Sequence, residues 1–131
     1  MSTDNVELTL RLYEHFNARN FDSLLMLTHE EIVIESRLVA VEGSYHGHEG
    51  VRRWWTNLLG AFPDYQAEPE EVRDLGELTL GRFRGVGNSA VSGTPVIDVF
   101  WQLLRWRDGA CIWWRNATTE AAVLEAVELP A

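Results

Sequence analysis

The chain has 131 residues, of which 46% are hydrophobic, and a formal charge of −9. This length and composition predict one globular domain over residues 1–131, with a core that needs no disulfides. The negative charge disfavours nucleic acids and anionic membranes as partners. No run approaches the roughly 18 apolar residues that a membrane span needs, and the N-terminus lacks the basic and apolar segments of a signal peptide. We therefore expect a cytoplasmic protein without a membrane partner.

Three helices are expected in the first half of the chain. The first follows an apolar stripe with spacings of three and four, formed by Val6, Leu10, Tyr13 and Phe16 and widened by Leu8 and Leu12. Thr3 or Asp4 can cap its start. A short second helix over residues 22–28 has Asp22 as its expected N-cap. The third covers residues 50–62 and buries a face that includes Trp54 and Trp55.

The strands are expected mainly in the second half. β-Branched alternation predicts an early strand over Glu31–Arg37. An antiparallel meander then follows, with strands at Tyr65–Leu75, Leu78–Val86, Pro95–Arg107 and Ala110–Ala117. Asp108-Gly109 is a two-residue hairpin signal, and Pro69 favours an edge position for its strand. A short C-terminal helix over residues 118–129 completes an α+β layout with the helices on one face of the sheet.

One carboxylate lies inside the most apolar predicted strand. Asp98 is surrounded by the residues of PVIDVFWQLL. Because side chains alternate along a strand, Asp98 shares a face with Phe100 and Gln102, whereas Trp101 lies on the opposite face. A few polar groups that converge in an apolar cavity are typical of a small-ligand site.

The element order and four segments resemble the SnoaL-like branch of the nuclear-transport-factor-2-like superfamily. The segments are YHGHEGVRRWW, GVGNSAVSGTPV, LLRWRDGACIWW and EAAVLEAVEL, and the resemblance covers almost the whole chain. It implies a cone-shaped barrel, in which a curved antiparallel sheet wraps round the N-terminal helices and leaves a pocket between them. Relatives include polyketide cyclases, ketosteroid isomerases, limonene epoxide hydrolases and non-catalytic binding domains, so the fold alone assigns no chemistry.

The catalytic acids that the resemblance implies for these activities are missing. The aspartate base and the first-helix tyrosine of ketosteroid isomerase-like proteins correspond to Ser36 and Leu12. The Asp–Arg–Asp set of limonene epoxide hydrolase-like proteins corresponds to Arg82, Arg84 and Asn116, which keep the arginine and lose both carboxylates. The aspartate of SnoaL-like cyclases corresponds to Gln102, which can orient a carbonyl group but is not a general base near neutral pH.

Asp98 therefore remains the candidate for catalysis. It is either a general acid/base, with Gln102 and Arg82 orienting the substrate oxygen, or the structural ion-pair partner of an arginine. The rest of the expected ligand-binding lining is Phe16, Ile34, Trp54, Trp55, Arg84, Phe100, Trp114 and Asn116.

Binding of a small, mostly hydrophobic molecule, with no reaction assigned, is the favoured function. An isomerase, cyclase or lyase that uses Asp98 is the first alternative. The second alternative is a dimeric, non-catalytic scaffold whose pocket is filled by its own side chains.

The residues on the opposite face of the sheet predict a protein partner, namely a second copy of this chain. Trp101, Trp113 and Arg105 suit a homodimer interface on this outer face, and Cys111 is expected to share it as an inert thiol. His46 and His48 are zinc-type ligands. They lie, however, in a glycine-rich loop where the family resemblance implies no metal, so we expect neither a metal nor a cofactor.

Overall fold

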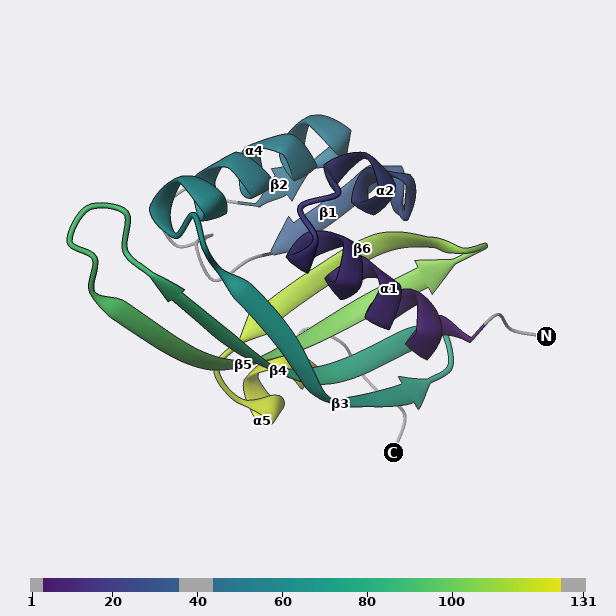
Figure 1. Ribbon diagram of the computed structural model, residues 1–131. Helices are drawn as coiled ribbons and strands as arrows, with labels where there is room; N and C mark the ends of the chain where they lie inside the picture. Colours follow the sequence, from purple (N-terminus) through teal and green to yellow (C-terminus); the bar gives the residue numbers. More distant parts are fainter. Residues whose placement is uncertain (1–3, 36–43, 126–131) are drawn as a thin grey trace.

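The computed structural model describes residues 4–35 and 44–125. The helices are α1 (Asn5–Asn17), α2 (Phe21–Met26), α4 (Gly47–Ala61) and α5 (Glu120–Leu124). The strands are β1 (Thr28–Glu35), β2 (Tyr45–His46), β3 (Gln66–Leu75), β4 (Leu78–Asn88), β5 (Pro95–Arg107) and β6 (Ala110–Ala117). They form one sheet in the order β2-β1-β6-β5-β4-β3, which places β3 at an edge as predicted (Figure 1).

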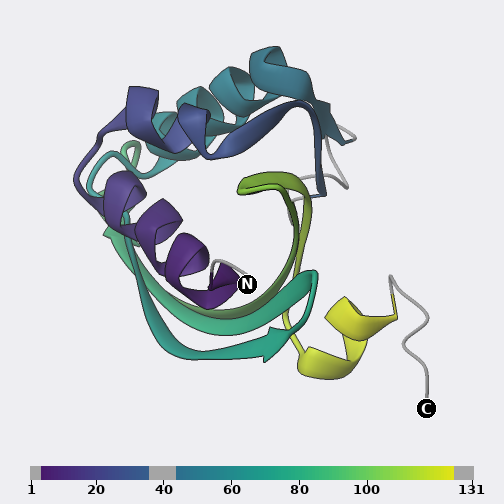
Figure 2. The ribbon, with the colours of Figure 1, turned by 90° about the vertical axis from the view of Figure 1, so that its right-hand side faces the viewer.

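The sheet curves around α1 and forms the predicted cone. Figure 2 shows α1 inside the curve, with α2 and α4 closing the other side. We call the face of the sheet turned toward α1 the concave face and the opposite one the convex face. The main core fills the concave side with buried side chains from α1 and the sheet, among them Leu12, Phe16, Ile34, Leu104 and Trp114.

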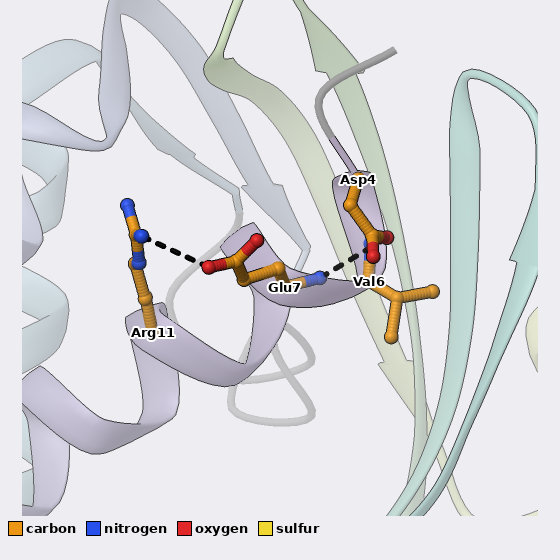
Figure 3. Close-up of polar contacts among 4 residues, drawn as sticks. All are labelled: Asp4, Val6, Glu7 and Arg11. Carbon is orange, nitrogen blue, oxygen red and sulfur yellow. Dashed lines mark hydrogen bonds and ion pairs between the residues drawn. The ribbon is translucent and has the colours of Figure 1, made fainter. Parts of the chain in front are cut away.

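An N-cap and an apolar stripe explain α1. The buried stripe contains Leu8, Leu12, Tyr13 and Phe16, whereas Leu10 of the predicted stripe is 41% exposed. The Asp4 side chain accepts hydrogen bonds from the backbone N–H groups of Val6 (3.1 Å) and Glu7 (3.4 Å), as Figure 3 shows. Glu7 also pairs with Arg11 one turn later, at 2.9 Å. The cap satisfies N–H groups that have no partner within the helix. The predicted cap at Asp4 is therefore confirmed.

The hairpin between β5 and β6 also follows the prediction. Both strands have the predicted bounds. Asp108 and Gly109 have positive φ angles of 51° and 81°, as a type I′ turn requires at both central residues. This turn fixes the register of the two strands that contribute most polar groups to the site described below.

Other element starts differ from the prediction. α2 is capped by Asn20, whose side chain accepts a hydrogen bond from the Ser23 N–H, and not by Asp22. β1 begins at Thr28, earlier than predicted, because it pairs there with the distant β6. α4 begins three residues early at Gly47, which has a φ of 68°. The predicted end of the first strand, Arg37, lies outside the described residues.

The sheet is mixed and not fully antiparallel. β1 runs parallel to β6, with Ile34 opposite Trp114, whereas the other strand pairs are antiparallel. Parallel neighbours are joined through a long connection and not a tight turn. The pairing of two segments so far apart in sequence is therefore not visible in any local pattern.

The last helix lies on the convex face, so the prediction that all helices share one face is wrong for α5 (Figure 2). Val123 of α5 is buried with Leu80 and Leu103, and Trp101 and Trp113 pack against this second cluster. The apolar side chains that β4 and β5 direct outward explain why this face needs a cover. Among the described helices, none is long and apolar enough to cross a membrane. The cytoplasmic location stays a prediction.

A β-bulge near the hairpin changes which side chains point inward. Arg105 pairs with Trp113, but Trp106 pairs with Cys111, so β6 has one extra residue between them. Cys111 consequently lies fully buried in the main core and not on the convex face with Trp113, as predicted. Burial raises the pKa of the Cys111 thiol to about 12.

Candidate functional site

A cavity of about 340 Å³ lies between α1, α4 and the concave face of the sheet. This volume is within the range of small-molecule sites in proteins. Most of the lining is apolar or aromatic, and it includes Leu12, Phe16, Leu24, Trp54, Leu58 and Phe62. The cavity therefore suits a ligand with an apolar body.

β5 brings the predicted polar face to the cavity. Asp98, Phe100 and Gln102 all line it, as their alternation along the strand predicted. Asp98 is half-buried, whereas Gln102 is buried. Gln102 lies four residue steps after Asp98 along the extended strand, which is about 13 Å at 3.3 Å per residue. A ligand that contacts both side chains must therefore extend along the cavity.

The neighbouring strand β6 adds Trp114 and Asn116. Both line the cavity, and Asn116 lies directly opposite Gln102 in the strand register. Phe16 of α1 and Trp54 of α4 complete the aromatic wall. The Trp54 and Trp114 rings meet edge to face, with centroids 5.1 Å apart.

Among the lining residues that the sequence reasoning missed, Tyr13 is the one that contacts Gln102. Its hydroxyl donates a hydrogen bond to Gln102 Oε1, and its ring stacks on Phe83 at 4.0 Å. Burial raises the pKa of the Tyr13 hydroxyl well above its ordinary value, so this group stays a neutral donor. The family resemblance had matched the first-helix tyrosine to Leu12, which also lines the cavity. The available signal was the spacing of three between Tyr13 and Phe16 on the buried stripe of α1.

Tyr65 reaches the cavity wall because Gly85 has no side chain. A Cβ atom on Gly85 would lie 1.8 Å from the Tyr65 hydroxyl oxygen, so the phenol occupies that space. Gly85 is the register partner of Asp98. Directly opposed Cβ positions lie about 5 Å apart. The Tyr65 hydroxyl therefore lies beside Asp98, and both residues line the cavity.

Arg82 and Arg84 do not point into the cavity, and their predicted place beside Asp98 is wrong. Arg82 is opposite Trp101 in the register, which puts it on the convex face. There its Nε lies 3.2 Å from Glu70 Oε1. Arg84 is likewise opposite a convex-face residue, Val99. Neither arginine can orient a ligand in the cavity.

The loop between β4 and β5 explains this error. Asn88 pairs with Pro95, so even-numbered residues of β4 oppose odd-numbered residues of β5 throughout the ladder. Opposed residues share a face. Alternation within each strand was predicted correctly, but the register between the strands depends on the loop, and a shift by one residue exchanges the two faces.

Two predicted ligand contacts lie behind the cavity wall. Ile34 is fully buried in the main core and is not among the described lining residues. Trp55 is also absent from this lining, and it packs edge to face against Phe16 (5.6 Å) and Phe21 (5.0 Å). Both residues support the wall from behind, and their contact with a ligand stays a prediction.

Two buried polar atoms of cavity-lining residues have no hydrogen-bond partner within the described structure. They are the indole nitrogen Nε1 of Trp114, a donor, and Oδ1 of Asn116, an acceptor. Trp114 as a whole is only 1% exposed. Buried polar groups in native proteins are nearly always paired, and an unpaired one costs about 1–3 kcal/mol. These atoms are therefore positions at which a ligand can complete the structure.

His46 and His48, which the sequence analysis considered as zinc-type ligands, lie at the start of α4. His48 lies 2.9 Å from the backbone oxygen of Thr28, measured from its Nε2, and His46 is the exposed residue before α4. In the part of the chain that the structure describes, no three His, Cys, Asp or Glu side chains gather as a metal-binding group.

Comparisons with known proteins agree on the fold. The SnoaL-like domain family matches residues 9–115. No curated protein matches the chain. Among solved structures, a candidate SnoaL-like polyketide cyclase from Jannaschia sp. CCS1 is 23% identical, with a TM-score of 0.78 and coverage of 98% of this chain and 94% of that one.

Two further structures are similar over nearly their whole lengths. An NTF2-like protein of unknown function from Burkholderia pseudomallei K96243 is 16% identical, with a TM-score of 0.79 over 98% of this chain and 100% of that one. TerC, co-crystallised with polyporic acid, is 18% identical, with a TM-score of 0.78 over 92% and 95%. At these identities the likeness shows a common fold and no common activity. With its cone-shaped sheet and a family match over most of its length, this chain belongs to the SnoaL-like domain family.

Proposed function

We propose that this chain binds a small, mostly apolar molecule in the cavity between α1, α4 and the concave face of the sheet. The observation that carries the proposal is the unpaired pair of polar atoms, Trp114 Nε1 and Asn116 Oδ1, within an aromatic wall. A ligand with an acceptor toward Trp114 and a donor toward Asn116 completes both groups, while its apolar body packs against Phe16, Trp54 and Phe100. The complex of TerC with polyporic acid supports this use of the fold.

A comparison of two adjacent tryptophans tests the proposal. Trp114→Phe removes the unpaired indole N–H in the cavity, and Trp113→Phe removes the indole N–H that donates to Glu35 on the convex face. We expect aromatic hydroxy ketones and phenols to bind the wild-type protein in calorimetric titrations. Trp114→Phe should weaken the best of them about tenfold, the equivalent of one hydrogen bond, and Trp113→Phe should leave its affinity unchanged. Equal effects of the two changes would contradict a ligand in the cavity.

Asp98 favours a second function, proton transfer in an isomerase, cyclase or lyase reaction. Asp98 lines the cavity with the Tyr65 hydroxyl beside it, and a general acid/base needs such direct access to the ligand. Because Arg82 faces outward and Gln102 lies about 13 Å along the strand, the group near Asp98 that can donate to a carbonyl oxygen is the Tyr65 hydroxyl.

Deuterium incorporation from heavy water into an enolisable ketone measures this proton transfer directly. We expect Asp98→Asn to slow the protein-dependent incorporation at least a hundredfold, the typical contribution of a general base. Asp108→Asn is the matched control, because it makes the same charge change in an exposed turn that accepts asparagine. Incorporation that does not depend on Asp98 would contradict the catalytic role.

The scaffold alternative requires a pocket filled by its own side chains, and the cavity volume argues against it. Homodimer formation through the convex face is a separate proposal. Trp101, Trp113 and Arg105 lie on that face as predicted, and Ile97, 67% exposed, extends its apolar surface. α5 covers part of the face, and Arg105 pairs with Glu77 at 3.3 Å. Sedimentation equilibrium should show a dimer that Ile97→Asp weakens, and an unchanged association constant would refute this interface.

A further inference from the structure

We propose that the cavity selects an uncharged ligand that carries a lactam or carboxamide group, in which a carbonyl oxygen lies beside an N–H. The inference rests on the proposed function, and it adds the class of the ligand's polar group. Four polar side chains that line one end of the cavity carry it. They are Tyr13, Gln102, Trp114 and Asn116, and we call this part of the cavity the Gln102 end.

The hydrogen bond from Tyr13 determines which atoms of Gln102 face the ligand space. α1 runs inside the curve of the sheet (Figure 2), and the Tyr13 hydroxyl donates to Oε1 of Gln102 on β5. Nε2 of the same amide has no acceptor among the described residues, and it is not one of the buried unpaired atoms. Its N–H donors therefore have access to the cavity that Gln102 lines. Tyr13 is thus a positioning residue that makes Gln102 a donor toward the ligand.

The three groups that face the ligand lie close together on two neighbouring strands. Asn116 is directly opposite Gln102 in the register, and Trp114 lies two residues before Asn116 on the same face of β6. Directly opposed Cβ atoms are about 5 Å apart, and diagonal neighbours such as Gln102 and Trp114 are about 7 Å apart. One functional group of a ligand can therefore contact all three side chains.

These groups need both an acceptor and a donor from the ligand. Trp114 Nε1 is a donor without a partner, and the Gln102 amide adds a second donor. Asn116 Oδ1 is an acceptor without a partner. A carbonyl oxygen has two lone pairs and can accept from both donors, while the adjacent N–H of a lactam donates to Asn116. Each of the three groups then has a partner.

Other common polar groups fit this end of the cavity less well. A carboxylate has no donor for Asn116, and an ammonium group has no acceptor for Trp114. A hydroxyl group has both, but on a single oxygen atom. That atom would have to contact two side chains from positions about 7 Å apart along β6. A lactam supplies its acceptor and its donor from two neighbouring atoms, which suits this separation better.

Three ligands of one bicyclic shape test the inference. They are carbostyril, which has the lactam group, N-methylcarbostyril, which lacks the N–H, and β-naphthol, which has a hydroxyl group instead. In calorimetric titrations of the wild-type protein, carbostyril should bind about tenfold more tightly than either of the others, the equivalent of one hydrogen bond. Asn116→Leu should remove most of its advantage over N-methylcarbostyril, because the N–H then has no acceptor.

Tyr13→Phe tests the orientation of Gln102. Without the tyrosine hydroxyl, the amide can turn its oxygen toward the cavity. The affinity for carbostyril should then fall about tenfold, whereas β-naphthol, which can donate to that oxygen, should bind as well as before or better. Tyr45→Phe is the matched control. It also removes a hydroxyl from a tyrosine that is 2% exposed, but Tyr45 is not among the described lining residues, and it should change neither affinity.

The outcomes separate this inference from the proposed function. Equal binding of the three ligands, or tightest binding of β-naphthol, would refute the lactam inference and leave the proposed binding function intact. Equal weakening of carbostyril and β-naphthol by Tyr13→Phe would refute the positioning role of Tyr13. If none of the three ligands binds, the proposed function and the inference both fail. The wild-type series needs no variant, so it decides the question even if Tyr13→Phe does not fold.

Discussion

The two faces of β5 and β6 satisfy their polar groups in different ways. On the convex face, side chains find partners within the chain: Arg82 with Glu70, Arg105 with Glu77, and Trp113 with Glu35. On the concave face, Gln102 and Trp106 also have partners, but Trp114 Nε1 and Asn116 Oδ1 are buried without one among the described residues. Trp113 and Trp114 are adjacent in sequence and chemically identical, so the difference comes from their surroundings. This difference is the basis of the proposal that a molecule from outside the chain completes the concave face.

Truncating one tryptophan on each face of β5 should give the largest difference in the free energy of unfolding between the two faces. Trp106 is 2% exposed on the concave side, where its Nε1 donates to Thr9 Oγ1 at 3.0 Å. Trp106→Ala should reduce the free energy of unfolding by about 3–5 kcal/mol. Trp101→Ala, on the half-buried convex side, should cost about 1 kcal/mol, a typical value for a mutation outside the core. Urea denaturation measures both, and equal losses would remove the distinction between the faces.

Tyr13→Phe tests the hydrogen bond to Gln102. The change leaves the Gln102 amide oxygen buried without its donor, which should cost about 1–3 kcal/mol of stability. The matched change on the convex face is Glu77→Gln, which weakens an exposed ion pair with Arg105 and should cost about 1 kcal/mol or less. A larger loss for Glu77→Gln in thermal or urea unfolding would reverse the expected ranking.

Cys111 should make stability depend on alkaline pH. Its folded pKa of about 12 is raised above the unfolded value, so the folded protein holds a proton that the unfolded chain releases near pH 9. This contribution is complete below pH 9 and is lost as the pH rises toward 12. The slope reaches about 1.4 kcal/mol per pH unit. Cys111→Ala should therefore show a shallower decline than the wild type in unfolding series above pH 9, and parallel curves would contradict the burial.

Asn116→Leu should have the smallest effect on stability. The change removes an unpaired buried acceptor, so stability should stay within about 1 kcal/mol of the wild type or rise slightly. Asn88→Leu is the contrasting variant, because the Asn88 amide donates a hydrogen bond to Asp64 Oδ2 at 2.6 Å. This change removes that hydrogen bond and should lower the stability. A clear loss of stability for Asn116→Leu would mean that Asn116 has a partner in solution.

Alternation within one strand was the most reliable guide to the site. It placed Asp98, Phe100 and Gln102 on the same side of β5, and the structure finds all three in the cavity lining. It could not place Arg82, because the face of β4 depends on the loop that connects it to β5. The bulge that turns Cys111 inward is equally invisible in the local pattern.

The candidate site is less predictable than the fold because it depends on contacts between distant segments. Tyr13 and Gln102 are brought together by packing of α1 on the sheet, and no spacing in the sequence encodes their hydrogen bond. The first-strand position that the family resemblance matched to a catalytic base, Ser36, lies outside the described residues. The roles predicted for Asp98 and Gln102 stay predictions.

The ring of Tyr65 fills the space that a side chain at Gly85 would occupy. The shape of the cavity at this point therefore depends on Tyr65 and not on the strands themselves. Tyr65 belongs to the connection between α4 and β3, while the backbone hydrogen bonds of β4 and β5 run beneath its ring. A smaller residue at Tyr65 enlarges the ligand space and leaves the strand pairing intact. A substitution at this one connecting residue is therefore expected to alter the shape of the proposed ligand site without rebuilding the barrel.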